Sequence, residues 1–313
     1  MAQPYHELHG RSMGTTWTVK FAAPAGAAHA DALEAAIQQT LERITRQMST
    51  WEADSAITVL NQSEPGWYQV PEELFHVLSH ALEVARQTGG AYDPTVGGLV
   101  DLWGFGPQGA IAVPPADSVI VAALAQTGWR RTALNTEHRG VWQPGRLQFD
   151  LSSIAKGYGV DQIAAVLDQH AIGHYLVELG GELKARGLNP RQSRWALGID
   201  IPGDSMTFPI SLGDCAIATS GDYRRGFEHE GRRYSHTLDP RTGRPLLHSL
   251  ASVSVLHRDC MLADALATAL LCLGPEQGPA YARTNGIAAL FMHRHPHDIA
   301  IESTAAFRAL TQC

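Results

Sequence analysis

The spacing of apolar residues changes along the chain, and each spacing predicts a different kind of element. Apolar positions three or four residues apart indicate amphipathic helices, and they predict helices over 29–48, 72–87 and 117–126. Alternation of apolar and polar positions indicates a half-buried strand. Residues 14–22 alternate in this way. The first half of the chain therefore mixes helices with strands.

Short strands dominate the second half of the chain. Two strands joined near Gly140 and ending at 147–150 come first, and a helix that Ser152 or Ser153 would cap then runs to about His170. The alternation predicts further strands over 174–179, 182–187, 195–201, 207–212, 215–219, 232–238 and 250–257, and a β-rich segment over 286–302.

The order of these elements favours one fold class. Helices and strands are interspersed without a regular β-α-β alternation, which argues for an α+β fold and against a doubly wound parallel sheet. A chain of 313 residues can form one elaborate domain or two intimately packed lobes. We expect a single domain over 1–313. The glycine- and proline-rich segment 91–116 should hold little regular structure, and a loop of this length is usually functional.

One predicted helix, residues 260–273, is apolar on every side except at Asp264 and Thr268. Those two residues lie four apart, so they share a face. A carboxylate and a hydroxyl on a buried helix are hard oxygen donors that suit Mg²⁺. Alternatively, Asp264 forms a buried salt bridge or caps a neighbouring turn, and Thr268 bonds back to its own helix. A further helix is predicted over 276–284.

Composition and charge exclude several classes of function. A net charge of −7 offers no broad basic surface, so nucleic acid is not an expected partner. No apolar run approaches the length of a membrane span. The four cysteines have neither zinc-site nor disulfide-framework spacing. No leader precedes Met13, so the chain as read is expected in the cytoplasm. A leader removed earlier would place it on the periplasmic face of the inner membrane.

Several clusters along the chain combine turn residues with chemically active side chains. In Asp150-Leu-Ser-Ser-Ile-Ala-Lys156, a strand leads into a helix whose N-terminus would suit a phosphate. A capped helix with a solvated lysine is the alternative. Neither a Walker A loop nor a Rossmann fingerprint is present. The other clusters are 12–17, 89–98, 178–182 and 235–245, and the last contains a good β-turn sequence at Asp239-Pro-Arg-Thr-Gly243.

Taken together and in order, the clusters resemble the FAD:protein FMN transferase (ApbE) family. The motifs are MGTTW, GGAYDPTVG, DLSSIAKGYGVD, ELGGE, SHTLDPRTGRP and ADALATAL, and they span nearly the whole chain from Met13 onwards. The resemblance implies the family's α+β architecture, with mixed or antiparallel sheets flanked by helices and a flavin cleft between lobes. It also implies Mg²⁺-dependent transfer of FMN from FAD to a Thr or Ser of a target protein, with release of AMP.

The resemblance also assigns site residues. By position in the motifs, Asp264, Thr268 and Ser153 match metal ligands, and His236 matches a candidate catalytic base beside the catalytic Asp264. Positions that match FAD contacts are Met13, Trp51, Ala91, Tyr92, Asp93, Asp150, Lys156 and Leu238. The implied partners are FAD and an acceptor flavoprotein subunit. Two alternatives use the same site: an FAD pyrophosphatase that yields FMN and AMP, and a non-catalytic FAD-binding protein.

Overall fold

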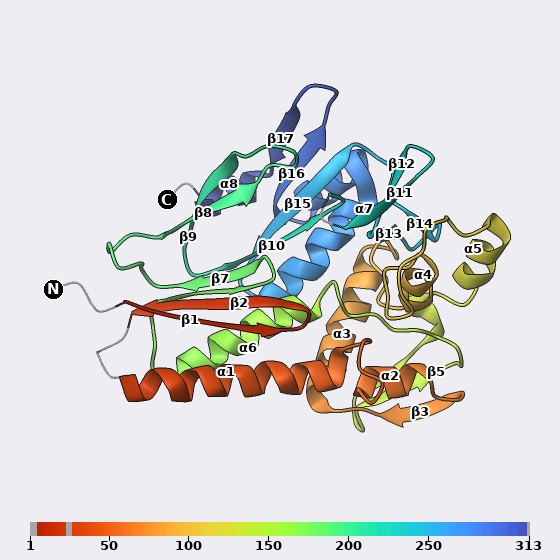
Figure 1. The fold of residues 1–313 in the computed structure, drawn as a ribbon, viewed down its shortest axis with the longest axis horizontal. Helices are drawn as coiled ribbons and strands as arrows, with labels where there is room; N and C mark the ends of the chain where they lie inside the picture. Colours follow the sequence, from red (N-terminus) through yellow and green to blue (C-terminus); the bar gives the residue numbers. More distant parts are fainter. Residues whose placement is uncertain (1–4, 23–26, 224, 312–313) are drawn as a thin grey trace.

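The computed structural model describes residues 5–22, 27–223 and 225–311, and an eight-stranded antiparallel sheet runs through its centre (Figure 1). The strands lie side by side in the order β1-β2-β6-β7-β10-β15-β16-β17. Their bounds are β1 (Tyr5–Ser12), β2 (Thr15–Ala22), β6 (Tyr175–Leu179), β7 (Glu182–Arg186), β10 (Ala216–Gly221), β15 (Leu250–His257), β16 (Ala288–Arg294) and β17 (Ile299–Ser303).

Helices cover one face of this sheet, and a hairpin with a short helix covers the other. The helices are α1 (Ala27–Met48), α6 (Ala155–Gln169) and α7 (Cys260–Thr284). The opposite face packs against β8 (Trp195–Asp200), β9 (Thr207–Leu212) and α8 (Ala305–Thr311). Because side chains alternate along a strand, Val177 of β6 lies in the core beneath α1 and α6, while Leu176 packs on the β8–β9 side. Both faces of the central strands of the sheet are therefore buried.

A second group of elements packs beside the sheet, on the right in Figure 1. It contains a three-stranded sheet in the order β3-β5-β4. Its members are α2 (Ala56–Asn61), β3 (Gly66–Gln69), α3 (Glu72–Gln87), α4 (Gly97–Leu102), α5 (Asp117–Leu124), the 3₁₀ turn η1 (Trp129–Arg131), β4 (Leu134–Asn135) and β5 (Gly140–Gln143). The largest buried cluster joins side chains of α1, α3, β5 and α6, so the two groups share one core.

Two small hairpins lie between the main sheet and this second group in the chain's final third. They are β11 (Gly226–His229) with β12 (Arg232–Ser235), and β13 (Leu238–Asp239) with β14 (Arg244–Pro245). The strand predicted over 232–238 is thus interrupted at His236. The β-turn predicted at 239–243 is confirmed, because the amide of Thr242 donates to the carbonyl of Asp239 at 3.2 Å, and the amide of Gly243 donates to the same carbonyl at 2.8 Å.

The predicted α+β class is confirmed, and the long periodic helices match well, with α3 coinciding with the expected 72–87. Two local predictions were wrong. The helix α6 begins after Ile154, and neither Ser152 nor Ser153 caps it. Residues 147–150 form no strand apart from one bridge, Val96 to Gln148. Segment 91–116, all of which is described, holds little regular structure, as predicted, because α4 is the one helix within it. Among the described helices, none combines the length and apolar character that a membrane crossing requires.

Candidate active site

The buried helix α7 crosses α6 at very short range. A Cβ atom at Gly157 would lie 2.3 Å from the carbonyl oxygen of Cys260, so glycine is required at the contact. The amide of Gly157 donates to Asp264 Oδ2 at 3.1 Å. In return, the amides of Cys260 and Met261 donate to the two oxygens of Asp161 at 3.0 and 2.9 Å. Each helix therefore supplies the carboxylate that caps the other helix's N-terminus.

Asp264 lies at the centre of this crossing and is almost fully buried. Burial raises the pKa of its carboxyl above the usual range, while nearby Lys156 acts in the opposite direction. Among the described residues, its hydrogen bond comes from Gly157 to Oδ2, so the predicted cap of a neighbouring turn is real. The Thr268 hydroxyl, however, bonds Ser220 Oγ at 2.8 Å and not its own helix.

A second buried carboxylate, Glu182 at the start of β7, faces the same region. Its Oε1 pairs with Lys156 Nζ at 2.6 Å, while Oε2 is buried without a hydrogen-bond partner among the described residues. Burial raises the pKa of Glu182 to about 7, and the Asp264 charge adds to the shift. Burial alone would lower the pKa of Lys156, but Glu182 and Asp264 raise it, so the lysine stays protonated.

Tyr92 and Asp93 lie on the glycine-rich segment that faces this crossing. Ser153 Oγ donates to the Tyr92 hydroxyl at 3.3 Å. Burial, and then the charges of Asp264 and Asp150, raise the pKa of Tyr92, so the phenol stays neutral. Asp93 accepts bonds from the Thr95 amide and hydroxyl and from the Trp129 amide. Neighbouring Ala91 is also buried. Asp93 therefore anchors the loop, whatever else it contacts.

Trp51 and Asp150 line one cavity of about 290 Å³ together with residues of α2 and α4. Trp51 is 64% exposed, which leaves its indole face open to a ring. Asp150 Oδ1 accepts from the Ser152 amide at 2.7 Å and the Ser152 hydroxyl at 2.5 Å. Asp101 also lines this cavity, although its Oδ1 is buried against Gly106. These polar groups could orient a planar ligand.

His236 occupies the break between β12 and β13. Its Nδ1 lies 3.3 Å from the carbonyl oxygen of Arg225. A carbonyl only accepts hydrogen bonds, so Nδ1 carries the proton and Nε2 is the basic nitrogen. Burial lowers the pKa of His236 despite the Arg225 carbonyl, and the charges of Arg225 and Lys156 lower it further. The imidazole is therefore neutral near pH 7 and able to accept a proton.

The turn that carries His236 is fastened to α7. Arg241 Nη2 donates to the carbonyl of Cys272 at 2.8 Å and also pairs with Asp239. Cys272 Sγ lies 3.5 Å from the carbonyl of Leu238, whose side chain is buried. These contacts meet α7 just before Gly274, where a φ of 84° kinks the helix and ends its predicted first part. The turn's position is thereby set relative to Asp264.

Met13 forms the turn between β1 and β2. The register pairs Ser12 with Thr15, so the loop has two residues, and both Met13 (φ 50°) and Gly14 (φ 71°) are left-handed. Two-residue hairpins favour this geometry. The Met13 sulfur would lie 3.4 Å from a Cβ at Gly159, which places it against the beginning of α6.

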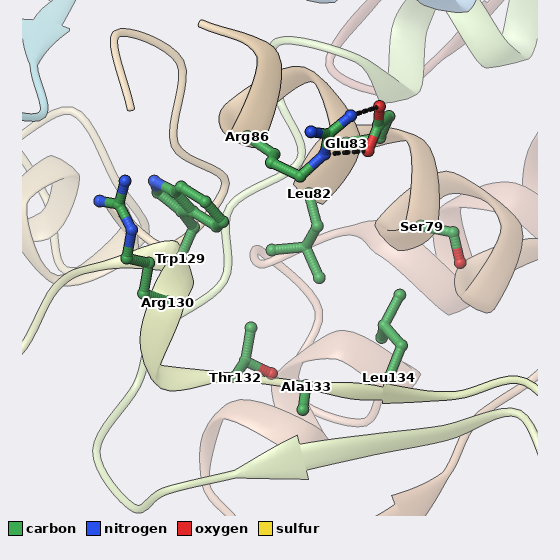
Figure 2. Close-up of a pocket in the computed structure, with 9 residues that line it drawn as sticks. All are labelled: Ser79, Leu82, Glu83, Arg86, Trp129, Arg130, Thr132, Ala133 and Leu134. Carbon is green, nitrogen blue, oxygen red and sulfur yellow. Dashed lines mark hydrogen bonds and ion pairs between the residues drawn. The ribbon is translucent and has the colours of Figure 1, made fainter. Parts of the chain in front are cut away.

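A larger cavity, of about 470 Å³, lies elsewhere (Figure 2). It is lined by α3 and by residues 129–134, and none of the residues predicted to contact FAD lines it. Its charged side chains include Arg86, which is paired with Glu83, and Arg130, which lies over the Trp129 ring. A hydrogen bond from the Trp129 amide to Asp93 joins the wall of this cavity to the glycine-rich loop. We therefore place the active site at the α6–α7 crossing.

Of the predicted residues, Lys156 on α6 and Asp264 and Thr268 on α7 lie at that crossing. Ser153 directly precedes α6 and contacts Tyr92. Electrostatic interactions connect Tyr92, Asp150, Lys156 and Asp264 with one another or with a shared neighbour, and Lys156 also acts on His236. Within the described ranges, no three His, Cys, Asp or Glu side chains form a ready-made metal site. A cation at Asp264 would need hydroxyl or carbonyl oxygens as well.

Sequence reasoning missed the role of Glu182, of Ser220 and of the paired caps. The signal for Glu182 was present: a carboxylate directly after a Gly-Gly turn, on a strand that packs beneath helices.

Comparisons with known proteins identify the family of this chain. The family model described as the ApbE family matches residues 13–291. A Vibrio cholerae protein named FAD:protein FMN transferase is 41% identical over 93% of this chain and 88% of its own length. A Haemophilus influenzae protein of the same name is 35% identical over 97% of this chain and 91% of its own.

Solved structures show the same similarity in three dimensions. Flavin transferase ApbE from Vibrio cholerae superposes with a TM-score of 0.92 at 38% identity, covering 98% of this chain and 99% of that one. The apo form of the Pseudomonas stutzeri flavinyl transferase ApbE gives a TM-score of 0.91 at 36% identity, covering 99% and 98%. The fold, the order of its motifs and these matches lead to one conclusion: the chain belongs to the ApbE family.

Proposed function

We propose that this protein transfers FMN from FAD to a Thr or Ser hydroxyl of an acceptor protein and releases AMP. The observation that carries the proposal is the match over nearly the whole chain to proteins named FAD:protein FMN transferase. The arrangement at the α6–α7 crossing supports it, because it gathers buried carboxylates, a protonated lysine and a neutral histidine at one place.

The donor set at the crossing fits Mg²⁺. Asp264 uses one oxygen for the Gly157 amide, and Thr268 offers a hydroxyl one turn along the same helix. Ser153 lies at the start of α6, where a carbonyl or hydroxyl oxygen could complete the set. All are hard oxygen donors. With Glu182 ionised, the two carboxylates outweigh the charge of Lys156, which also favours a cation. Bound there, Mg²⁺ would neutralise charge on the pyrophosphate.

The protein's own groups have separate tasks in the transfer. By resemblance to the family, Trp51, Tyr92 and Met13 would pack on the flavin and adenine rings. Ala91, Asp93, Asp150 and Leu238 would contact other parts of FAD. Lys156 contributes fixed positive charge beside the phosphates. His236 Nε2 accepts the proton of the acceptor hydroxyl. The hydroxyl oxygen then bonds to the FMN-side phosphorus, and the bond from that phosphorus to the bridging oxygen breaks, so AMP departs with the bridging oxygen.

Two other activities use the same groups. If water reached the phosphorus in place of a hydroxyl, the protein would be an FAD pyrophosphatase. If nothing did, it would bind FAD without turnover. The neutral, basic histidine favours turnover, because storage of FAD requires no base.

Chromatography of the products separates the three activities. With FAD, Mg²⁺ and acceptor present, the transferase yields AMP without an equal amount of free FMN. Equal amounts of AMP and free FMN in the presence of acceptor would indicate the pyrophosphatase. Unchanged FAD would indicate a binding protein.

A further inference from the structure

Lys156 interacts with two buried carboxylates that come from different elements. Glu182 is the first residue of β7, and Asp264 lies on α7, while Lys156 itself belongs to the first turn of α6. These three elements pack directly against one another (Figure 1). The lysine nitrogen pairs with Glu182 at 2.6 Å, and within the described residues it forms no ion pair with Asp264, although the charges interact.

Burial of the Glu182 carboxyl at this position lowers the stability of the fold. It is 2% exposed, and its Oε2 is buried without a hydrogen-bond partner in the described ranges. An ionised carboxyl in such surroundings costs stability unless a cation compensates it. A neutral side chain of the same shape, such as glutamine, would fill the same space without that cost. The charge of Glu182 must therefore have a role that packing does not explain.

A neighbouring trio shows what happens when a lysine reaches the aspartate of this crossing. At the other end of the contact, Lys184 Nζ lies 2.6 Å from Asp161 Oδ1, and the amides of Cys260 and Met261 take the remaining positions. Both oxygens of that aspartate are therefore engaged in structural contacts. Lys156 has the same chemistry and lies near Asp264, so it would occupy Asp264 in the same way if nothing held it elsewhere.

We propose that Glu182 is a positioning residue that holds Lys156 away from Asp264 and so keeps the Asp264 carboxylate open for a divalent cation. The inference rests on the metal site in the proposed function. Glu182 acts only through Lys156 and does not itself bind the metal. It follows that removing the Glu182 charge frees the lysine to pair with Asp264 and compete with the cation.

Binding of Mn²⁺ to the FAD-free protein, followed by electron paramagnetic resonance of the unbound ion, tests this without relying on activity. We expect Glu182→Gln to weaken Mn²⁺ binding by about 10- to 100-fold, the usual effect of losing a residue behind a metal ligand. Adding Lys156→Met to that variant should restore binding to near the wild-type level, because the competitor is gone. Glu178→Gln, in the same motif, is the matched control and should bind normally, since glutamine can still accept from the Gly181 amide.

The outcomes separate the possibilities. Wild-type binding by Glu182→Gln would overturn the inference. Failure of Lys156→Met to restore binding would also overturn it and identify Glu182 as a direct ligand. If Glu182→Gln does not fold, Lys156→Met with and without Glu182→Gln replaces it: equal affinities support the inference, and a large loss contradicts it. If the wild-type protein itself does not bind Mn²⁺, the metal site in the proposed function fails instead.

Discussion

The two ends of the α6–α7 crossing use the same parts for opposite purposes. At one end Asp161 accepts from two amides of α7 and from Lys184, so both of its oxygens are engaged. At the other end Asp264 accepts from one amide of α6, and its nearby lysine is paired with Glu182. At the first end the carboxylate serves structure. At the second end, which we call the open end of the crossing, Asp264 has one oxygen that accepts no hydrogen bond from the described residues.

This difference shows how a buried carboxylate can be assigned to structure or to chemistry. Both aspartates cap a helix, so capping alone does not distinguish them. What distinguishes them is the number of partners: among the described residues Asp161 accepts three hydrogen bonds from backbone amides and Lys184, and Asp264 accepts one from the Gly157 amide. Substitutions at Asp264 and at Asp161 test whether the two ends of the crossing have different roles.

The largest effect should come from Asp264→Ala. We expect a loss of transfer activity of at least about 10³-fold, because several kcal/mol of metal-derived stabilisation would be removed. The fold should persist, since the change removes a buried charge together with one hydrogen bond. Activity assays and far-ultraviolet circular dichroism on one preparation check both points. Normal transfer by the variant at micromolar Mg²⁺ would contradict the assignment of Asp264 as a metal ligand.

His236→Ala should slow transfer by roughly 10²–10⁴-fold, the usual contribution of general acid–base catalysis, with little change in FAD affinity. Burial lowers the pKa of His236, so the histidine loses its basic form only below the usual pH range of histidines. The wild-type rate should therefore fall on the acid side below that range, and the variant should lack this limb. His9→Ala, on the exposed strand β1, is the control. A rate loss matched by unfolding would reduce His236 to a support of its turn.

Asp161→Ala should affect stability more than chemistry. It removes the cap of α7 and leaves the partly buried Lys184 without its partner, which we expect to cost about 2–4 kcal/mol in the free energy of unfolding. Denaturant unfolding measures that loss. At a temperature where the variant remains folded, its transfer rate should stay within a few-fold of wild type. A variant that is stable but inactive would show that Asp161 also serves catalysis, so the two ends would not differ in role.

The smallest effect concerns ligands. FAD should raise the melting temperature more than FMN at equal concentration, by about 2–5 °C, because a site that spans both phosphates and the adenine binds FAD more tightly. A thermal-shift series with both nucleotides measures the difference. Equal shifts would mean that the adenine half makes no contact with the site.

The sequence alone predicts the features of the fold and the site that depend on neighbouring residues. Helix α7 and its Asp264–Thr268 pair follow from composition and spacing, and α3 follows from periodicity. Strand β1 escaped because its exposed edge carries few apolar residues. The caps from Asp161 and Asp264 and the Lys156–Glu182 pair join residues far apart in the chain, and no local pattern encodes which lysine meets which carboxylate. The prediction that a serine caps α6 was wrong, because the Ser152 hydroxyl donates to Asp150 instead.

If the open end of the crossing serves FMN transfer to a protein, an acceptor should gain FMN only when Asp264 is intact. The most direct test is intact-mass and peptide mass spectrometry of a candidate acceptor subunit after incubation with FAD, Mg²⁺ and the wild-type protein, with Asp264→Ala and Asp161→Ala in parallel. The account predicts one added FMN on a Thr or Ser with wild type and with folded Asp161→Ala, and none with Asp264→Ala. Equal modification by all three, or AMP release with no FMN attached to the acceptor, would contradict it.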